Sequence, residues 1–448
     1  MSHFVFLFFT DPVLRAPTIG CMLMCMAAAL VGVIVFLKKQ SLLGESLSHA
    51  AYPGVIIGII IAGMMGVSEE QEFFMAILIM SGALGSALMG MWSIDFLEKR
   101  LKVRSDSALC FILAVFFGIG VTLASQVQFA YSSLYRQVQV YLYGQAATMT
   151  DIHILIYGVL ALTILIVVIA FYKEIQGIAF DPEYIRSIGV NKRVVDTLVF
   201  LLIVLAVVIG IRSVGVVLMS AMLIAPAAAA RQYSDKLYQV FALSAFFGIL
   251  SGFSGNYLSV EVSKVLAAKY PGERLALPTG PMIVVVASLI CLLSLMFAPK
   301  RGLLLRLGRI VRFRYQCMCE NLLKAIWRFG PERKVTFEAI ARNQTASFLY
   351  LKLVLHSLVR QGWVKKVQGG YCLTPEGALW AARIVRLHRL WEVYLVDYLG
   401  VGAERVHRSA EEMEHAIDPE LEAKLTLILN DPKYDPHHQL IPALKKLL

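Results

Sequence analysis

Histidine and carboxylate residues are grouped at helical spacing near the C-terminal end of this chain. One group pairs His388 with Glu392, and a second comprises His407, Glu411, Glu414 and His415. Residues three or four positions apart share a helix face, so each group would present imidazole nitrogens and carboxylate oxygens on one side. This ligand chemistry suits iron(II), manganese(II) or zinc(II). A solvated acidic face would explain the glutamates, but six ligand-type residues in two groups favour a metal site.

A smaller pair lies near the N-terminus. Glu45 and His49 are four residues apart, so one helix face would carry both, and together they could ligate a divalent cation. The spacing alone leaves another interpretation open. In that interpretation the segment is a polar helix start, where Ser46 and Ser48 bond to the backbone.

The elements that must position these residues include membrane spans. The chain has 448 residues, 58% hydrophobic and 16% charged, whereas a soluble domain usually has about 25% charged residues. The long apolar runs end near residue 298. A bilayer crossing needs roughly 20 apolar residues of helix. Nine stretches reach or approach that length, at 17–37, 46–66, 73–92, 108–125, 153–172, 194–211, 214–230, 236–256 and 281–298.

The sequence therefore predicts an all-α polytopic membrane domain over residues 1–298, with eight or nine transmembrane helices. The number stays open because 194–230 could be one kinked or re-entrant unit. With nine crossings and an outer N-terminus, the inner loops carry most of the lysines and arginines. The positive-inside rule then places everything after Pro299 in the cytoplasm. The net charge of +11 is thus compatible with basic cytoplasmic loops as well as with a nucleic-acid partner.

Residues 299–318 are predicted to form a basic linker. Six lysines and arginines occur between Pro299 and the next acidic residue, Glu320. Directly after a membrane span, such a run favours anionic lipid headgroups by about 1 kcal/mol per charge. The alternative is a tether that is cleaved or that touches DNA.

Residues 319–380 are predicted to form a small helical module with a β-hairpin. Helices are expected at about 320–329, from 336 and at 345–361, and strand, Gly-Gly turn and strand at 362–374. This is the order of a winged helix-turn-helix, whose third helix enters the major groove. The expected base or phosphate contacts are Ser347, Tyr350 and Lys352, with Lys365 and Lys366 for phosphates in the wing. Because Phe348 and Leu349 make the third helix unusually apolar, a protein-binding winged helix stays open.

Three segments of the N-terminal part carry a family resemblance. Residues 42–54 have the sequence LLGESLSHAAYPG, residues 179–190 AFDPEYIRSIGV and residues 215–230 GVVLMSAMLIAPAAAA. They resemble the zinc/manganese/iron ABC transporter permease family, whose signature is Gly-Asp-x-Leu-Ser-His-Ala followed by Pro-Gly. The resemblance covers about residues 1–298. It implies that Glu45, where the family has Asp, and His49 lie on the ion path.

The same resemblance implies several partners. The segment with Asp181, Pro182, Glu183 and Gly189 would contact an ATPase, and Asp181-Pro182 can start a short helix that Gly189 ends. An ordinary solvated loop is the alternative for this segment. No phosphate-binding Gly-x4-Gly-Lys-Ser/Thr motif occurs in the sequence. ATP hydrolysis is therefore expected on a separate ATP-binding subunit, and the chain itself is not expected to be an enzyme. A second permease subunit and an extracytoplasmic metal-binding protein are the other expected partners.

The C-terminal part carries a second resemblance. The segments LTPEG at 373–377, RLHRLWE at 386–392 and VHRSAEEMEH at 406–415 resemble the diphtheria-toxin-repressor family of metal-dependent regulators, over about residues 319–442. The resemblance implies that the six residues of the two C-terminal groups bind two neighbouring regulatory ions. It also implies that residues 381–448 form a helical metal-sensing and dimerisation domain that makes a homodimer.

This second resemblance has two departures from the family pattern. Glu411 occupies a position that is Cys in the iron-type branch of the family. In this respect the chain resembles the manganese-type branch. Asn321 and Lys324 fall where the first helix would donate ligands, with Glu320, Cys317 and Cys319 as nearby substitutes.

Both halves together predict the permease of an ABC importer for Fe²⁺, Mn²⁺ or Zn²⁺, fused to a repressor that uses the same metal as co-repressor and binds operator DNA. The expected location is the bacterial inner membrane, with the C-terminal domain in the cytoplasm or released by proteolysis within 299–318. One alternative is a tail that senses metal and gates transport without binding DNA. Another is a membrane-bound transcription factor whose spans no longer transport.

Overall fold

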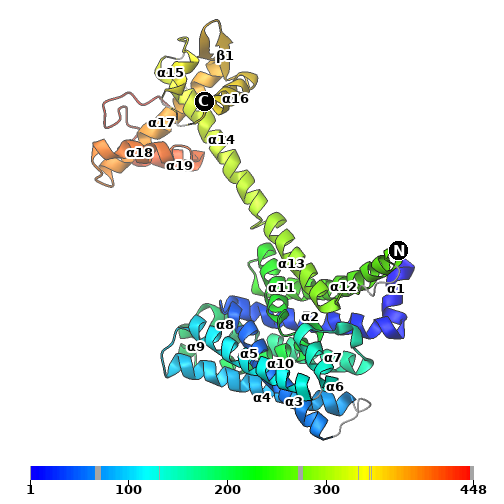
Figure 1. The fold of residues 1–448 in the computed structure, drawn as a ribbon. Coiled ribbons are helices and arrows are strands. Elements are labelled where there is room, and N and C mark those ends of the chain that lie inside the picture. The colour runs from blue at the N-terminus through cyan, green and yellow to red at the C-terminus, as the bar shows by residue number, and fades with distance from the viewer. Residues whose placement is uncertain are drawn as a thin grey trace. The chain divides into compact units, whose positions relative to one another are not determined.

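The computed structural model describes residues 2–65, 72–130, 132–270, 276–330, 332–342, 344 and 346–443. The chain divides into two compact units, Met1–Leu305 and Arg306–Leu448, and each is described by itself. Figure 1 labels their elements.

The first unit is helical. Its elements are α1 (Ser2–Thr10), α2 (Pro12–Leu37), α3 (Ser41–Met64), α4 (Glu72–Lys99), α5 (Ser105–Ala130), α6 (Ser132–Tyr143), the 3₁₀ turn η1 (Ala146–Thr148), α7 (Asp151–Ala170), α8 (Tyr172–Phe180), α9 (Pro182–Ser187), α10 (Lys192–Val214), α11 (Met219–Tyr233), α12 (Leu237–Lys269) and α13 (Thr279–Phe297). Eight helices among the described residues are long and apolar enough to cross a bilayer, namely α2, α3, α4, α5, α7, α10, α12 and α13.

The apolar stretch at 214–230 does not form a long helix. α10 ends at Val214, and α11 has only 15 residues. Gly215 separates them with φ of +93°, a conformation that glycine adopts without steric cost. Its α-carbon also lies so close to the chain at Tyr143 and Gly144 that a Cβ would be 2.6 Å from the Tyr143 carbonyl carbon. The sequence predicted a separation or kink at 211–213, and the structure has it slightly later, at Gly215.

Close backbone contacts hold the centre of the first unit together. A Cβ on Gly32 of α2 would lie 1.8 Å from the Leu223 carbonyl oxygen of α11, and one on Gly54 of α3 would lie 2.0 Å from the Gly82 carbonyl oxygen of α4. Small residues allow membrane helices to approach in this way, where dispersion contacts replace a hydrophobic driving force. α2 and α3 are accordingly the most buried of the long helices.

The second unit begins within α14 (Leu303–Arg328) and continues with α15 (Phe337–Ala341), α16 (Phe348–Arg360), β1 (Val364–Val367), β2 (Gly370–Leu373), α17 (Pro375–Asp397), α18 (Ala403–Met413) and α19 (Pro419–Ile428). α14 starts well before Glu320, so most of the stretch predicted as a linker is helix. Leucine and arginine are good helix formers, and α14 contains no proline. Its basic composition alone could not distinguish a helix from an extended tether.

The predicted β-hairpin forms, but it turns at Gln368 and Gly369, one residue before the Gly-Gly pair that was predicted as the turn. β1 and β2 pair antiparallel, with Val364 opposite Leu373 and Val367 opposite Gly370. Gly369 has φ of +85°, as a tight hairpin turn requires. The core beneath it combines residues from α14, α15, α16, the hairpin and the start of α17, among them Leu322, Ile326, Ile340, Leu355 and Val364.

Gly377, in the first turn of α17, is expected to tolerate no side chain. A Cβ there would lie 1.9 Å from the Trp363 carbonyl oxygen, and backbone cannot move aside as a flexible side chain can. Gly377→Ala should therefore lower the free energy of unfolding by about 2 kcal/mol, as overpacking does, although alanine is the better helix former. Denaturant unfolding of the purified chain measures this.

The matched control is Gly308→Ala in α14, where a Cβ would meet nothing within 4 Å. This change should leave stability unchanged or raise it slightly. Equal effects of the two substitutions would contradict the expected clash at Gly377.

Candidate metal centre

α17 positions the first two ligand-type residues of the centre. Its start is fixed by Thr374, whose hydroxyl accepts a hydrogen bond from Gly377 N, and by Pro375 in the first turn. His388 and Glu392 then lie one turn apart on the buried face. His388 Nε2 is 3.3 Å from Glu392 Oε1.

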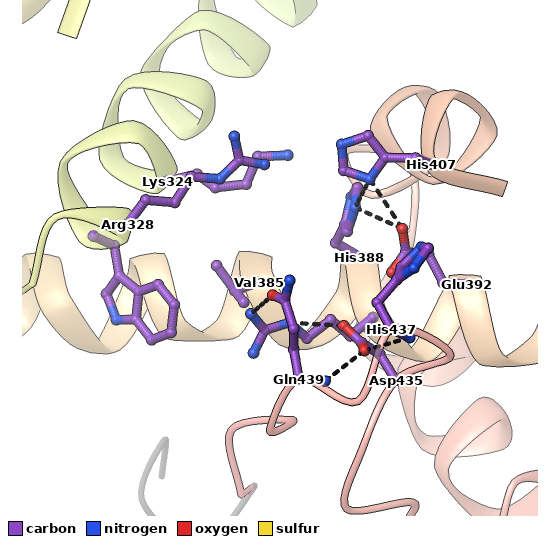
Figure 2. Close-up of a pocket in the computed structure, with 11 residues that line it drawn as sticks. Lys324, Arg328, Val385, His388, Glu392, His407, Asp435, His437 and Gln439 are labelled. Carbon is purple, nitrogen blue, oxygen red and sulfur yellow. Dashed lines mark hydrogen bonds and ion pairs between the residues drawn. The ribbon is translucent and has the colours of Figure 1, made fainter. Parts of the chain in front are cut away.

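α18 brings His407 to the same point. Its Nδ1 lies 3.0 Å from Glu392 Oε1 and 3.1 Å from His388 Nε2, and its side chain is 52% exposed. Figure 2 shows His388 and His407 facing each other with Glu392 beside them. One ligand atom from each of the three lies within 4.8 Å of the others, so their donors fit a divalent ion of the kind that binds imidazole and carboxylate.

These three residues line a pocket of about 390 Å³. Its lining also includes Arg389, whose Nε lies 3.3 Å from Asp435 Oδ2. Asp435 is buried, and its Oδ1 accepts hydrogen bonds from the backbone N–H groups of His437 and Gln439. Asp435 was not among the residues predicted from the sequence, although an aspartate inside a Pro- and His-rich loop was an available signal. The pocket leaves room for an ion beside His407.

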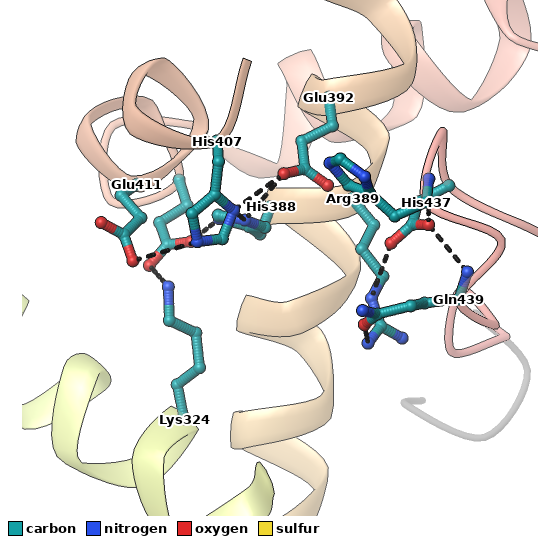
Figure 3. Close-up of polar contacts among 10 residues, drawn as sticks. Lys324, His388, Arg389, Glu392, His407, Glu411, His437 and Gln439 are labelled. Atoms are coloured by element: carbon teal, nitrogen blue, oxygen red, sulfur yellow. Dashed lines mark hydrogen bonds and ion pairs between the residues drawn. The ribbon is translucent and has the colours of Figure 1, made fainter. Parts of the chain in front are cut away.

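The other three predicted ligands extend the same network. Glu414 Oε2 lies 2.5 Å from His388 Nδ1, and Glu414 Oε1 lies 2.5 Å from Lys324 Nζ. Glu411 Oε1 is 3.6 Å from His407 Nε2. Figure 3 shows Lys324 reaching this cluster from α14. Spacing predicted both groups on helices. The structure brings them together, but α18 ends at Met413, so Glu414 and His415 lie in the turn that follows it.

His415 contacts the first helix. Its Nδ1 lies 2.5 Å from Glu320 Oε2, so Glu320, one of the nearby substitutes, does reach the centre. Cys317 is less suited to hold a metal, because burial and then the charge of Glu320 raise the pKa of its thiol to about 11. Only the thiolate is a good ligand.

The charges in the network stabilise one another. Burial alone would lower the pKa of His388, but hydrogen bonds with Glu392 and Glu414 outweigh burial and raise it. Burial would raise the pKa of Glu392, which its bonds to His388 and His407 instead hold low. Burial of Glu414 is likewise outweighed by His388 and Lys324, so its pKa is also low. Within the cluster, the buried imidazole and carboxylates therefore favour one another's charged forms.

The predicted DNA-contacting residues lie on the surface of the second unit. Ser347 is the N-cap residue of α16, and Tyr350 and Lys352 lie on its exposed side. Lys365 and Lys366 are exposed on β1. The same side of α16 also exposes Phe348 (61%) and Leu349 (72%).

In the first unit, Glu45 and His49 lie one turn apart on α3, as predicted. Glu45 lines a groove of about 450 Å³ between α3, α11 and α13, together with Ser41, Ser220, Ser288 and Cys291. His49 is buried, its ring edge-on to Phe117 at 4.6 Å. Among the described residues its Nδ1 has no hydrogen-bond partner. A buried polar atom without a partner calls for an explanation, and a transient ligand would supply one.

The segment after α8 forms the predicted short helix. Asp181 Oδ1 accepts a hydrogen bond from Tyr184 N at 3.0 Å, and α9 begins at Pro182. Gly189, with φ of +84°, follows its end. Glu183 lies on its exposed surface.

Comparison with known proteins assigns the first unit to a protein family. Residues 10–298 match the model of the ABC 3 transport family. The chain belongs to this family. A probable metal transport system membrane protein of Chlamydia pneumoniae is 39% identical over 98% of both chains. The manganese transport system membrane protein MntC of Bacillus subtilis is 30% identical, over 84% of this chain and 82% of the relative.

A solved structure shows the same fold for this ABC 3 family chain. PsaBC from Streptococcus pneumoniae in complex with Fab aligns with a TM-score of 0.55 and 24% identity, over 67% of this chain and 97% of that chain. With eight apolar helices among its described residues, the chain is a multi-pass membrane protein. The permease resemblance is confirmed.

The C-terminal part matches a different family model. Residues 374–443 match the metal binding and dimerisation domain of iron dependent repressors, and this range contains all six predicted ligands. The repressor resemblance is also confirmed. This ABC 3 family permease therefore carries a repressor-type metal-binding domain in the same chain.

Proposed function

We propose that this ABC 3 family permease imports a divalent transition metal and that its C-terminal domain is a repressor activated by the same metal. The observation that carries the proposal is the convergence of His388, Glu392 and His407 in a chain with a metal-permease domain. Manganese is the first choice, because Glu411 supplies oxygen where a thiolate would favour softer ions and the Bacillus relative is named for manganese. Iron(II) and then zinc(II) share the ligand chemistry.

Ion pairs at the helix ends support nine crossings. Arg15 pairs with Asp151 at the start of α2, and Lys38 pairs with Asp196 at its end. The start of α13 lies beside the end of α10, because a Cβ on Gly280 would be 2.9 Å from the Ser213 carbonyl oxygen. Just beyond the other end of α13, Arg301 pairs with Asp235 at 2.5 Å. The segment from Gly215 to Asp235 thus runs between the same two ends as α13, and short α11 completes a ninth crossing.

Nine crossings with an outer N-terminus place residues after Pro299 in the cytoplasm of a bacterial cell. We assign 1–298 to the permease, 299–318 to a basic connector, 319–380 to a winged helix-turn-helix and 381–448 to metal sensing and dimerisation. The helices and hairpin from α14 to β2 support the winged module. α14 makes most of the connector helical, so 299–302 is the favoured stretch for proteolytic release.

In the membrane, the ion passes Glu45 and His49. Intramembrane ionisable residues are costly and mark ion pathways. The groove at Glu45 is open on one side of the first unit, and a second permease subunit would close it. Two copies of Glu45 and His49 would then line one route.

Partners at the two membrane faces follow from the same topology. α9, with Asp181, Pro182, Glu183 and Gly189, lies on the inner side and would contact the separate ATP-binding subunit. The outer segment 126–152, which contains all of α6 and η1, would receive the extracytoplasmic metal-binding protein.

In the C-terminal domain, an ion at His388, Glu392 and His407 would link α17 to α18 and favour the DNA-binding form, so that imported metal represses import. Exposed apolar side chains at Tyr398, Leu399, Leu427 and Ile428 suit a homodimer contact. Paired α16 helices could then read two half-sites of an operator, one DNA turn apart.

A mobility-shift experiment tests the repressor. The purified full chain in nanodiscs should retard the DNA upstream of its own operon with Mn²⁺ and not with a chelator. The exposed Phe348 and Leu349 favour a second candidate, in which α16 binds protein and the tail gates transport in place. Absence of metal-dependent retardation would favour that candidate over the repressor.

A further inference from the structure

We propose that the Lys324 ammonium takes the place of one metal ion in the C-terminal centre, so that each chain binds a single regulatory ion at His388, Glu392 and His407. The inference rests on the proposed function, because it concerns the number of ions at the same centre. It departs from the two neighbouring ions that the repressor resemblance implies.

The position of Lys324 is that of a bound cation. Its Nζ lies 2.5 Å from Glu414 Oε1, and the two side chains are only 7% and 0% exposed. A lysine this buried is found only with a partner that compensates its lost hydration. The other oxygen of Glu414 is held by His388 Nδ1 at 2.5 Å. Both oxygens of this carboxylate are therefore occupied by groups of the chain.

Donors for a second ion surround the ammonium. His415 Nε2 is buried with no hydrogen-bond partner in the described part of the chain, and it lies 3.5 Å from Glu414 Oε1. Glu320 holds the opposite nitrogen of the same ring at 2.5 Å. His415 Nε2 and the Lys324 ammonium thus lie near the same oxygen of Glu414. A divalent ion there would meet the positive charge of Lys324 at contact distance.

The first group of ligands is free of this conflict. His388 Nε2, Glu392 and His407 meet at one edge of the His388 ring. Lys324 lines the same pocket, but its ammonium is paired with Glu414, which contacts the other edge of that ring. The His388 ring separates the two positions, with Nε2 toward the open one and Nδ1 toward Glu414. One position is open to an ion and the other is closed by a side chain.

A single ion per chain limits which helix contacts the metal controls. Lys324 belongs to α14 and Glu414 follows α18, so this ion pair ties the two helices together without any metal. Metal then controls the contact between α17 and α18 alone. Saturation by one ion per chain predicts a simple hyperbolic titration, without the steepness that two coupled ions would give.

The experiment counts Mn²⁺ per chain by mass spectrometry of bound metal and by calorimetric titration. The full chain is used in nanodiscs, with Glu45→Ala and His49→Ala to remove the membrane site. We expect one ion per chain when Lys324 is intact and two in Lys324→Met, which removes the charge but keeps an extended side chain. Lys324→Arg keeps the charge and should bind one.

Lys424→Met is the matched control, because Lys424 also pairs with a glutamate, Glu420, but on the surface. It should bind one ion. Two ions in the chain with Lys324 intact would overturn the inference, whether or not Lys324→Met folds. One ion in folded Lys324→Met would overturn it as well. No ion in the intact chain would instead refute the metal-sensing function on which the inference rests.

Discussion

Glu45→Ala is expected to reduce manganese uptake by about 100-fold. Glu45 is the carboxylate of the groove between α3, α11 and α13, and a divalent ion leaving water needs ligands that replace its hydration. Removing one partner of a buried charge pair costs about 3 kcal/mol or more, which corresponds to a factor of about 100. His49→Ala should act in the same direction. Uptake of radioactive Mn²⁺ into proteoliposomes that contain the chain and its ATPase measures the effect.

Two control variants make this test specific. Glu45→Asp restores the family residue and should transport within about tenfold of the unchanged chain, since a shift of ligand geometry without loss of charge costs roughly 1.4 kcal/mol at most. Glu261→Ala removes a glutamate that pairs with Lys264 outside the groove, and uptake should persist. Unchanged uptake in Glu45→Ala and His49→Ala would remove both residues from the ion path.

His388→Ala with His407→Ala is expected to abolish metal-dependent binding to the operon's upstream DNA. These residues supply two of the three atoms that converge within 4.8 Å. Loss of even an indirect metal contact typically lowers affinity 10- to 100-fold, so loss of two ligands should raise the Kd for Mn²⁺ by more than about 100-fold. Mobility shifts across a manganese titration measure the loss.

The matched control for this variant is His437→Ala. His437 lines the same pocket, but it lies outside the group of three converging ligands. Its replacement should leave the manganese dependence of retardation nearly unchanged. Equal loss in both variants would show that the pocket as a whole, rather than the three ligands, supports binding.

The sequence predicted the ligand-type residues better than the contacts that these residues make. Spacing of four placed His388 and Glu392 on one helix face, because that relation is local. The contacts of His407 with His388, and of His415 with Glu320, join segments 19 and 95 residues apart. Such pairs depend on how α17, α18 and α14 pack, which periodicity does not encode. Lys324 was flagged as a departure from the family, but its contact with Glu414 appears only in the structure.

In the membrane part, too, the sequence predicted some features and not others. Eight apolar stretches became long helices because length and hydropathy are the main requirements of a bilayer span. The ninth gave only the short α11, because the backbone turns at Gly215, close to Tyr143 and Gly144, and α11 begins only at Met219. The stretch from 303 to 318 became helix rather than linker, because alternating leucine and arginine suit an amphipathic helix as well as a basic tether.

The most direct test of two separate metal sites in one chain is equilibrium dialysis of the full chain against radioactive Mn²⁺. Replacing Glu45 and His49 should remove one part of the bound manganese, replacing His388 and His407 should remove the remainder, and replacing all four should leave none. If either pair alone eliminates all bound manganese, or if neither pair removes any, the chain does not combine a metal path with a metal sensor.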